Sequence, residues 1–251
     1  MAASRLSIDP MQMVCSDKTR LPDVCFVSYA TFRRIKIDIM NKYHQLLGRI
    51  ITSGNEQENK KGSIRYLLNE RLELTPGDLL DIFEDHGIAR KKLRTELRLF
   101  MSGERDVEKY RNEGITWWDY CGSTLVNSYP TYLEKLPPLI KRINRERRNS
   151  KNYVLFLGST DAESNQAPCL SLVQFQIDGG ELVLSAYQRS SDANLGLPAD
   201  LYHLYLMTRQ IDLPLKSITL NLGNVHIYRN NLERTRSLLD GEEGIRFELN
   251  A

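Results

Sequence analysis

The chain lacks long hydrophobic runs and is poor in cysteine. No eighteen consecutive residues are apolar, so the sequence predicts no transmembrane helix, and the start "MAASRLSIDPMQM" lacks the apolar stretch of a secretory signal. The four cysteines, Cys15, Cys25, Cys121 and Cys169, show no metal-ligand spacing, and their even number in a chain this long does not imply a disulfide framework. We therefore expect a reduced, cytoplasmic protein in which a cysteine is either a core residue or a nucleophile.

An excess of charge of one sign is also missing. The 34 basic and 32 acidic residues leave a net charge of +2. A general binder of nucleic acid or of an anionic membrane usually carries a larger basic excess, so we expect neither partner. A local cluster of basic residues is still able to bind a small anion.

Repeats and linkers are absent, and helix-like and strand-like segments alternate along the chain. Apolar spacing predicts helices over 41–52, 90–101, 136–148 and 198–211. The expected strands are 23–32, a strand pair over 64–74, and 217–228 with a glycine break, and the polar stretch 53–63 is expected to be a loop. The pattern predicts one α/β or α+β domain over 1–251, built around a mixed sheet.

The segment 169–188 gives the clearest local prediction. Two apolar runs flank Asp178-Gly179-Gly180, which is a strong signal for a β-hairpin. A cysteine at such a place is by itself most often a buried small residue. The residues around it point further, because many of them stand at fixed spacings from one another.

Two blocks of the sequence resemble the thymidylate synthase family. The family pattern runs Pro-Cys, Gln-Phe, Arg-Ser-x-Asp-x-x-Leu-Gly-x-Pro and His-x-Tyr. It is matched in order by Cys169, Gln174, Phe175, Arg189, Ser190, Asp192, Leu195, Gly196, Pro198, His226 and Tyr228. A second block places Glu96, Gly103, Trp118 and Asp119 on the family's positions without a gap. The resemblance covers roughly 43–235 and leaves 1–40 as an N-terminal extension.

This resemblance implies a fold and a chemistry. The fold would be a mixed, twisted β-sheet flanked by helices, with a homodimer formed by sheet packing. Cys169 would add to carbon 6 of a pyrimidine nucleotide, so that carbon 5 attacks the one-carbon unit of 5,10-methylenetetrahydrofolate. Arg189 would lower the pKa of the thiol and hold the phosphate, and Glu96 would handle protons through waters.

The resemblance also implies the binding residues. Ser190 matches a phosphate ligand, and His226 and Tyr228 match the residues that hold the sugar hydroxyl. Trp118 and Asp192 match folate contacts, whereas the neighbouring Trp117 either joins them or belongs to the core. Further phosphate ligands would be Lys60 or Lys61 from an early loop, and Arg147, Arg148 and Lys151 reaching across from the partner subunit. Tyr129 or Tyr132 would add to the base pocket.

Asp200 is the main departure from the common thymidylate synthase pattern, which has Asn there. The family's cytidylate hydroxymethylases carry Asp at this position, and a carboxylate accepts from the 4-amino group of cytosine. The alternative for Asp200 is a helix cap. Leu170 also stands where thymidylate synthases usually have His, and the sequence after "HIYRNNLERTRSLL" is short, which fits an open site where water completes the reaction.

The sequence therefore favours a hydroxymethyltransferase acting on CMP or dCMP. One alternative is a methylase of dUMP or dCMP from the same family. Another is a regulator that binds nucleotides and has lost catalysis.

Overall fold

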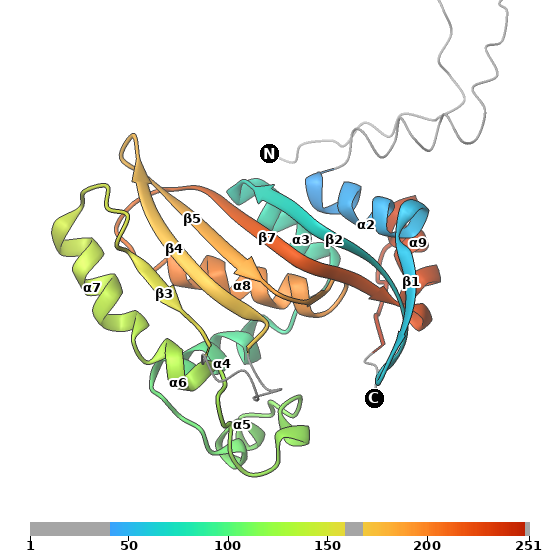
Figure 1. The fold of residues 1–251 in the computed structure, drawn as a ribbon, viewed down its shortest axis with the longest axis horizontal. Helices are drawn as coiled ribbons and strands as arrows, with labels where there is room; N and C mark the ends of the chain where they lie inside the picture. The colour runs from blue at the N-terminus through green and yellow to red at the C-terminus, as the bar shows by residue number, and fades with distance from the viewer. Residues whose placement is uncertain (1–40, 159–167, 249–251) are drawn as a thin grey trace, which may run out of the picture. The chain divides into compact units, whose positions relative to one another are not determined.

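The computed structural model describes residues 41–158 and 168–248 (Figure 1). The strand expected over 23–32 lies outside the described residues. Within them, one sheet contains the strands β1 (Asn55–Asn59), β2 (Gly62–Leu74), β3 (Val154–Phe156), β4 (Leu170–Asp178), β5 (Glu181–Gln188), β6 (Ser191–Asp192) and β7 (Leu215–Tyr228). Their order is β1-β2-β7-β5-β4-β3, with β6 also paired to β7. The sheet is mixed, because β7 pairs in parallel with β5 and β6 while the other pairs are antiparallel.

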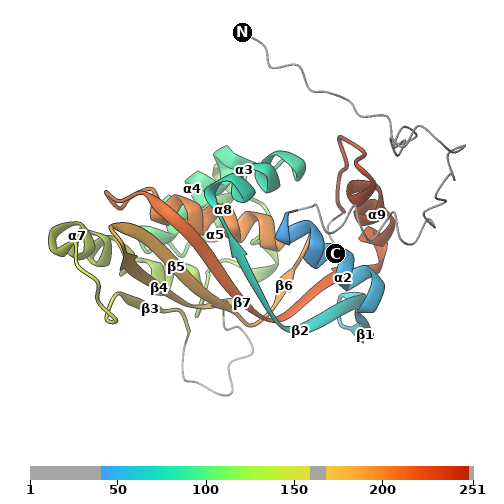
Figure 2. The ribbon, with the colours of Figure 1, turned by 90° about the horizontal axis from the view of Figure 1, so that it is seen from above.

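The α-helices flank this sheet. They are α2 (Lys42–Ser53), α3 (Pro76–Asp85), α4 (Arg90–Met101), α5 (Val107–Asn112), α6 (Tyr129–Leu133), α7 (Leu136–Glu146), α8 (Gly196–Thr208) and α9 (Leu232–Asp240). Figure 2 shows α3, α4 and α8 on one face of the sheet and no labelled helix on the other. This architecture confirms the predicted fold class. No helix of the described residues is long and apolar enough to cross a membrane.

Helix α8 lies at the centre of the core. It contacts β5 and β7 below it and α3 and α4 beside it, so that apolar side chains are buried around most of its circumference. The contacting strand β5 buries the alternating residues Leu182, Leu184 and Ala186. Because α8 is covered on nearly all sides, a polar side chain on it must find a partner inside the protein.

The predicted hairpin is confirmed, as are the four predicted helices, with ends shifted by a few residues. Strands β4 and β5 are joined at Gly179 and Gly180, whose φ angles of 61° and 84° match the turn type that favours glycine at both positions. The helix expected over 136–148 ends at Glu146, and the helix expected over 198–211 begins at Gly196.

Three sequence expectations were wrong in detail. Most of 53–63, which was expected to be a loop, forms strand β1 and the turn into β2. Nothing in the sequence indicated this strand, because every residue of β1 is exposed and shows no apolar alternation. Residues 64–74 belong to the single strand β2, with a positive φ of 55° at Asn69. Strand β7 runs through Gly223 without a break. A Cβ there would lie 2.7 Å from the Tyr187 hydroxyl, so glycine permits close approach.

Candidate active site

Cys169 stands directly before β4, opposite Arg189 at the end of β5. The hairpin pairs Asp178 with Glu181 and Leu172 with Tyr187, but then pairs Leu170 with Gln188. Ser171 is therefore the extra residue of a β-bulge. As a result the backbone N–H of Arg189 donates to the carbonyl of Cys169 at 2.8 Å, and the Arg189 guanidinium donates to the carbonyl of Pro168 at 3.2 Å.

The charges around the Cys169 thiol act in both directions. Burial raises its pKa most, Arg189 lowers it, Asp200 raises it, and Lys61 lowers it. The net result is a pKa above the ordinary value of a cysteine. The expectation that Arg189 lowers the thiol pKa is thus correct in sign, but burial outweighs it in the single chain.

Glu96 is almost fully buried on α4 and accepts hydrogen bonds on both carboxylate oxygens. The indole N–H groups of Trp117 and Trp118 both donate to Oε1 at 2.5 Å. Nε2 of His203 lies 3.2 Å from Oε2. Trp117 is therefore not merely a core neighbour of Trp118, since it contributes a polar contact to the predicted proton-handling residue.

Asp200 lies inside α8 and does not cap it. The N-cap position of α8 is Leu195, five residues earlier. The Asp200 carboxylate accepts a hydrogen bond from the side-chain amide of Gln188, which is fully buried. Burial raises the pKa of Asp200, while His203 and Gln188 lower it and Glu96 raises it, which brings it to about 6. The helix-cap alternative is thereby removed.

His226 and Tyr228 lie side by side on β7. Their ring centroids are 5.1 Å apart with perpendicular planes. Nδ1 of His226 contacts the Asn224 side-chain oxygen at 3.0 Å, and burial lowers the pKa of His226 to about 4. Burial, with Asp192 and Cys169, raises the pKa of Tyr228. A neutral imidazole and a neutral phenol suit hydrogen bonds to sugar hydroxyl groups.

Asp192, Trp117 and Trp118 are the residues expected to bind folate. The Asp192 carboxylate accepts from the backbone N–H of Asn194 at 3.0 Å, and burial raises its pKa to about 6. The rings of Trp118 and Tyr120 lie 6.3 Å apart, and 74% of Tyr120 is exposed. Among the described residues, the buried hydroxyl of Ser191 has no hydrogen-bond partner. The exposed ring of Tyr120 beside Trp118 offers an aromatic surface that suits a flat ring system.

Of the two tyrosines, Tyr129 lies nearer the base pocket. Its hydroxyl accepts from the backbone N–H of Leu170 at 3.2 Å. Its pKa is raised by burial, and also by Asp200, Cys169 and Glu96. Tyr132 instead donates to the side chain of Asn127.

Lys60 and Lys61 form the turn of the β1–β2 hairpin. The Lys61 ammonium lies 5.2 Å from the centre of the Tyr120 ring, and its charge reaches Cys169. The structure thus brings Lys61 to the mouth of the site. Lys60 is exposed beside it.

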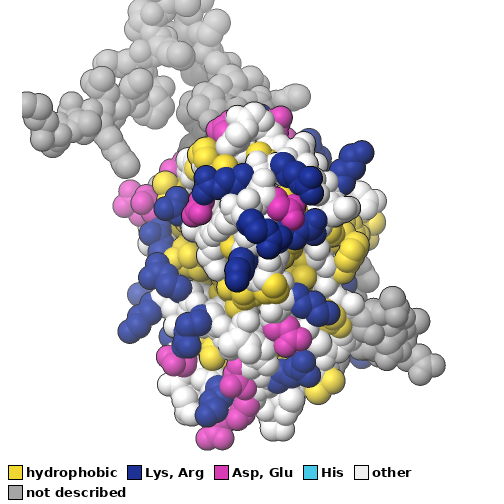
Figure 3. Space-filling model, turned by 90° about the vertical axis from the view of Figure 1, so that its left-hand side faces the viewer, with side chains coloured by type: hydrophobic (Ala, Val, Ile, Leu, Met, Phe, Trp, Pro, Cys, Tyr) yellow, Lys and Arg dark blue, Asp and Glu magenta, His cyan; other side chains and the backbone are white. Residues whose placement is uncertain are grey.

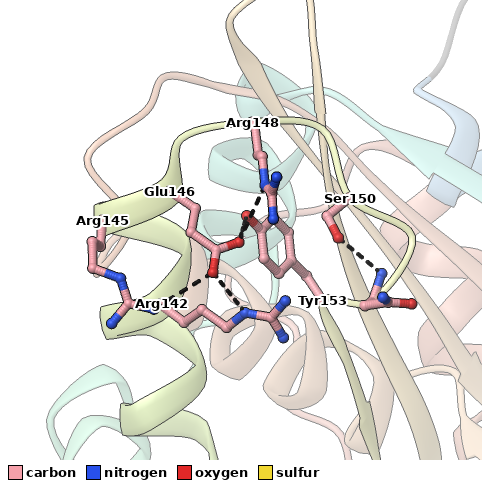
Figure 4. A network of polar contacts seen from close by, with 7 residues as sticks. Arg142, Arg145, Glu146, Arg148, Ser150 and Tyr153 are labelled. Carbon is pink, nitrogen blue, oxygen red and sulfur yellow. Dashed lines mark hydrogen bonds and ion pairs between the residues drawn. The ribbon is translucent and has the colours of Figure 1, made fainter.

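The basic residues Arg147, Arg148 and Lys151 lie away from Cys169, before the start of β3. The side chain of Gln174 donates to the Lys151 carbonyl at 3.2 Å, and Gln174 lies five residues beyond Cys169, or roughly 15 Å along the strand. Figure 4 shows Arg148 in a network with Arg142, Arg145 and Tyr153 around Glu146. Arg147 pairs with Asp212 at 3.1 Å. Figure 3 shows basic side chains gathered on this side of the molecule.

Three polar contacts of the site were not expected from the sequence. Gln188 holds Asp200, His203 holds Glu96, and Asn224 holds His226. Gln188 and Asn224 each stand within two residues of a motif residue. This proximity is the one feature of the sequence that could have indicated their contacts. His203 stands three residues after Asp200, so it shares a helix face with it.

The structure thus holds a cysteine beside an arginine, a buried carboxylate on α4 fixed by indoles, and a His-x-Tyr pair on β7, which are residue types that nucleophilic catalysis can use. The thymidylate synthase family model matches residues 41–249, and the chain belongs to this family. Family membership supports folate-dependent one-carbon transfer to a pyrimidine nucleotide.

Proposed function

We propose that the protein is a hydroxymethyltransferase that adds the one-carbon unit of 5,10-methylenetetrahydrofolate to carbon 5 of CMP or dCMP. The observation that carries this proposal is the place of Asp200. Asp200 is half-buried within α8, its carboxyl group is held by Gln188, and it is close enough to influence the pKa values of Cys169 and Tyr129. A carboxyl group in that position reads the base next to the nucleophile.

The hydrogen-bonding edge of cytosine fits this carboxyl group. Cytosine presents a 4-amino donor and an acceptor at nitrogen 3, and Asp200 accepts from the amino group. With a pKa near 6, its protonated form also donates to nitrogen 3. Uracil presents a donor at nitrogen 3 and a carbonyl oxygen at carbon 4, which an ionised carboxylate repels. A buried mismatch of this kind costs about 1–3 kcal/mol for each unpaired group.

Each step of the proposed reaction has a residue of this chain. The Cys169 thiol loses its proton, its sulfur bonds to carbon 6, and the ring electron pair moves to carbon 5. Carbon 5 then bonds to the one-carbon unit, which the folate would supply when bound, and the bond between that unit and the folate nitrogen would break. Glu96 would receive, through water, the proton that carbon 5 releases. A water molecule loses a proton and adds its oxygen to the exocyclic carbon, and the electron pair that moves to carbon 5 restores the ring double bond as the sulfur of Cys169 leaves carbon 6.

We further propose that the enzyme acts as a homodimer through the sheet face that carries no helix in Figure 2. Phe156 and Tyr187 are large side chains of this sheet that remain 68% and 42% exposed. Arg147, Arg148 and Lys151 lie too far along the sheet to reach a phosphate beside their own Cys169. Reaching a partner's site gives these cations a function. Arg189, Ser190 and Lys60 or Lys61 supply the phosphate contacts from the same chain.

Release of tritium from carbon 5 tests the proposed reaction. Labelled CMP, dCMP and dUMP are assayed in parallel with 5,10-methylenetetrahydrofolate, and the folate product is identified. Release from a cytosine nucleotide with tetrahydrofolate as product is the expected result. Release together with dihydrofolate indicates a methylase, and release from dUMP alone contradicts the role given to Asp200. Failure of a 5-fluoropyrimidine nucleotide to form a covalent adduct would indicate a regulator without catalysis.

A further inference from the structure

His203 is a buried histidine to which the proposed reaction assigns no role. It lies on α8, is 8% exposed, and its helix neighbours Leu201, Tyr202 and Leu204 are all buried. Nε2 lies 2.9 Å from the carbonyl oxygen of Leu93 and 3.2 Å from Oε2 of Glu96. Both partners only accept hydrogen bonds, so Nε2 must carry the hydrogen. This fixes the ring nitrogen that donates.

The contact completes the environment of Glu96. The two indole N–H groups occupy Oε1, and His203 is the donor at Oε2. A buried carboxylate is costly unless donors satisfy it, and donors on both oxygens also fix the plane of the group. Without His203, the Oε2 atom would lose this donor and the plane of the carboxylate would be less constrained.

His203 also stands between the two carboxylates of the site. Asp200 is three residues earlier on the same helix, Glu96 faces the imidazole from α4, and the Tyr129 hydroxyl senses both carboxylates from α6. Burial lowers the pKa of His203, but the hydrogen bond and charge of Glu96, with Asp200, raise it above the ordinary value. In return, the charge of His203 lowers the pKa of Asp200.

We propose that His203 is a positioning residue that orients Glu96 for proton handling and links it to the base-reading Asp200. This inference rests on the proposed function, because it assigns His203 to that same site. An apolar side chain would pack in α8 at lower cost than a buried imidazole. The geometry therefore points to a role that packing alone does not require.

The variants His203→Gln and His203→Leu separate the hydrogen bond from the charge. The Gln amide can donate near the position of Nε2 but cannot be protonated, and Leu does neither. We expect His203→Leu to lower kcat for tritium release by about 100-fold, with KM for the nucleotide changed by less than about threefold. We expect His203→Gln to recover about tenfold of that loss, with a pH profile that lacks the imidazole limb.

The matched control is His44→Gln. His44 is another largely buried histidine, with Nε2 3.1 Å from the Asp85 carboxylate, but it lies on α2 away from Glu96. We expect it to leave kcat within about twofold of the parent value. A His203→Leu variant with kcat within threefold of the parent and an unchanged pH profile overturns the proposal. So does a variant that is only less thermostable, with kcat per folded enzyme unchanged.

A second readout does not depend on turnover. Long-range nitrogen–proton NMR spectra of the full chain should show His203 protonated at Nε2, with a signal that shifts in Glu96→Gln. A signal that does not respond to Glu96→Gln overturns the proposal even if both His203 variants fail to fold. The activity comparison uses whichever nucleotide the parent enzyme turns over. A parent enzyme that prefers dUMP therefore contradicts the proposed function alone.

Discussion

The cluster around Cys169 and the basic run at 147–151 satisfy their charges in different ways. In the cluster, the buried carboxylate of Glu96 is held by two indoles and a histidine, and the half-buried carboxylate of Asp200 by an amide. In the basic run, exposed cations pair with the neighbouring carboxylates of Glu146 and Asp212. The first arrangement is preorganised within one chain. The second is a set of surface pairs, each weak enough to be exchanged for a phosphate group.

Removing the nucleophile is the largest change available on the preorganised side. Cys169→Ala should lower tritium release by at least about 10³-fold, because no other group forms the bond to carbon 6. Nucleotide affinity, measured by calorimetry, should stay within a few-fold of the parent. Cys121→Ala, which removes the other described cysteine, is the control and should retain most activity. Comparable activity in both variants would contradict the assignment of the nucleophile.

Mixing two inactive variants tests whether the two regions meet across a dimer. One variant carries Cys169→Ala, and the other carries Arg147→Ala, Arg148→Ala and Lys151→Ala together. After joint refolding, half of the dimers are mixed and each has one intact site, so about a quarter of the parent activity should return. The control mixes Cys169→Ala with Glu96→Gln, whose defects fall in the same-chain cluster. Every site then has at least one defect, and no activity should return.

Specificity for the base should change less steeply. Asp200→Asn replaces an acceptor by an amide that suits uracil, so the ratio of kcat/KM for dCMP to that for dUMP should fall about 10- to 100-fold. The ratio is measured with both nucleotides competing in one tube. Lys61→Ala, at the mouth of the site, should weaken both nucleotides alike. An unchanged ratio in Asp200→Asn would show that another group reads the base.

The smallest effect concerns stability and pH. Burial raises the folded-state pKa of Asp200 to about 6. Its proton therefore stabilises the fold below the ordinary carboxyl pKa, and this stabilisation is lost as the pH rises through 6. Asp200→Asn should raise the free energy of unfolding at pH 8 by at most about 3 kcal/mol, which thermal unfolding would show as a higher Tm. This gain should vanish toward pH 4. The exposed control Asp212→Asn should show little change at either pH.

The sequence predicted contacts within a motif better than contacts between distant segments of the chain. The motif spacings account for the contact of Cys169 with Arg189 and of His226 with Tyr228, because spacings along one hairpin and one strand become distances in a sheet. The contact between His203 and Glu96 joins residues 107 positions apart, on helices whose packing no local pattern encodes. The β1–β2 hairpin was missed for another reason, since an edge strand exposed throughout shows no periodicity.

The β-bulge at Ser171 has a consequence for how the nucleophile obtains its counter-ion. With regular pairing, the partner of Cys169 would be Ser190, and the Arg189 side chain would point away from the sulfur. Because Ser171 is unpaired, Cys169 instead lies opposite the charged Arg189. Deleting Ser171 would leave the composition of the site intact while moving its cation by one residue. The contact between the thiol and the arginine therefore depends on the strand register as well as on which residues are present.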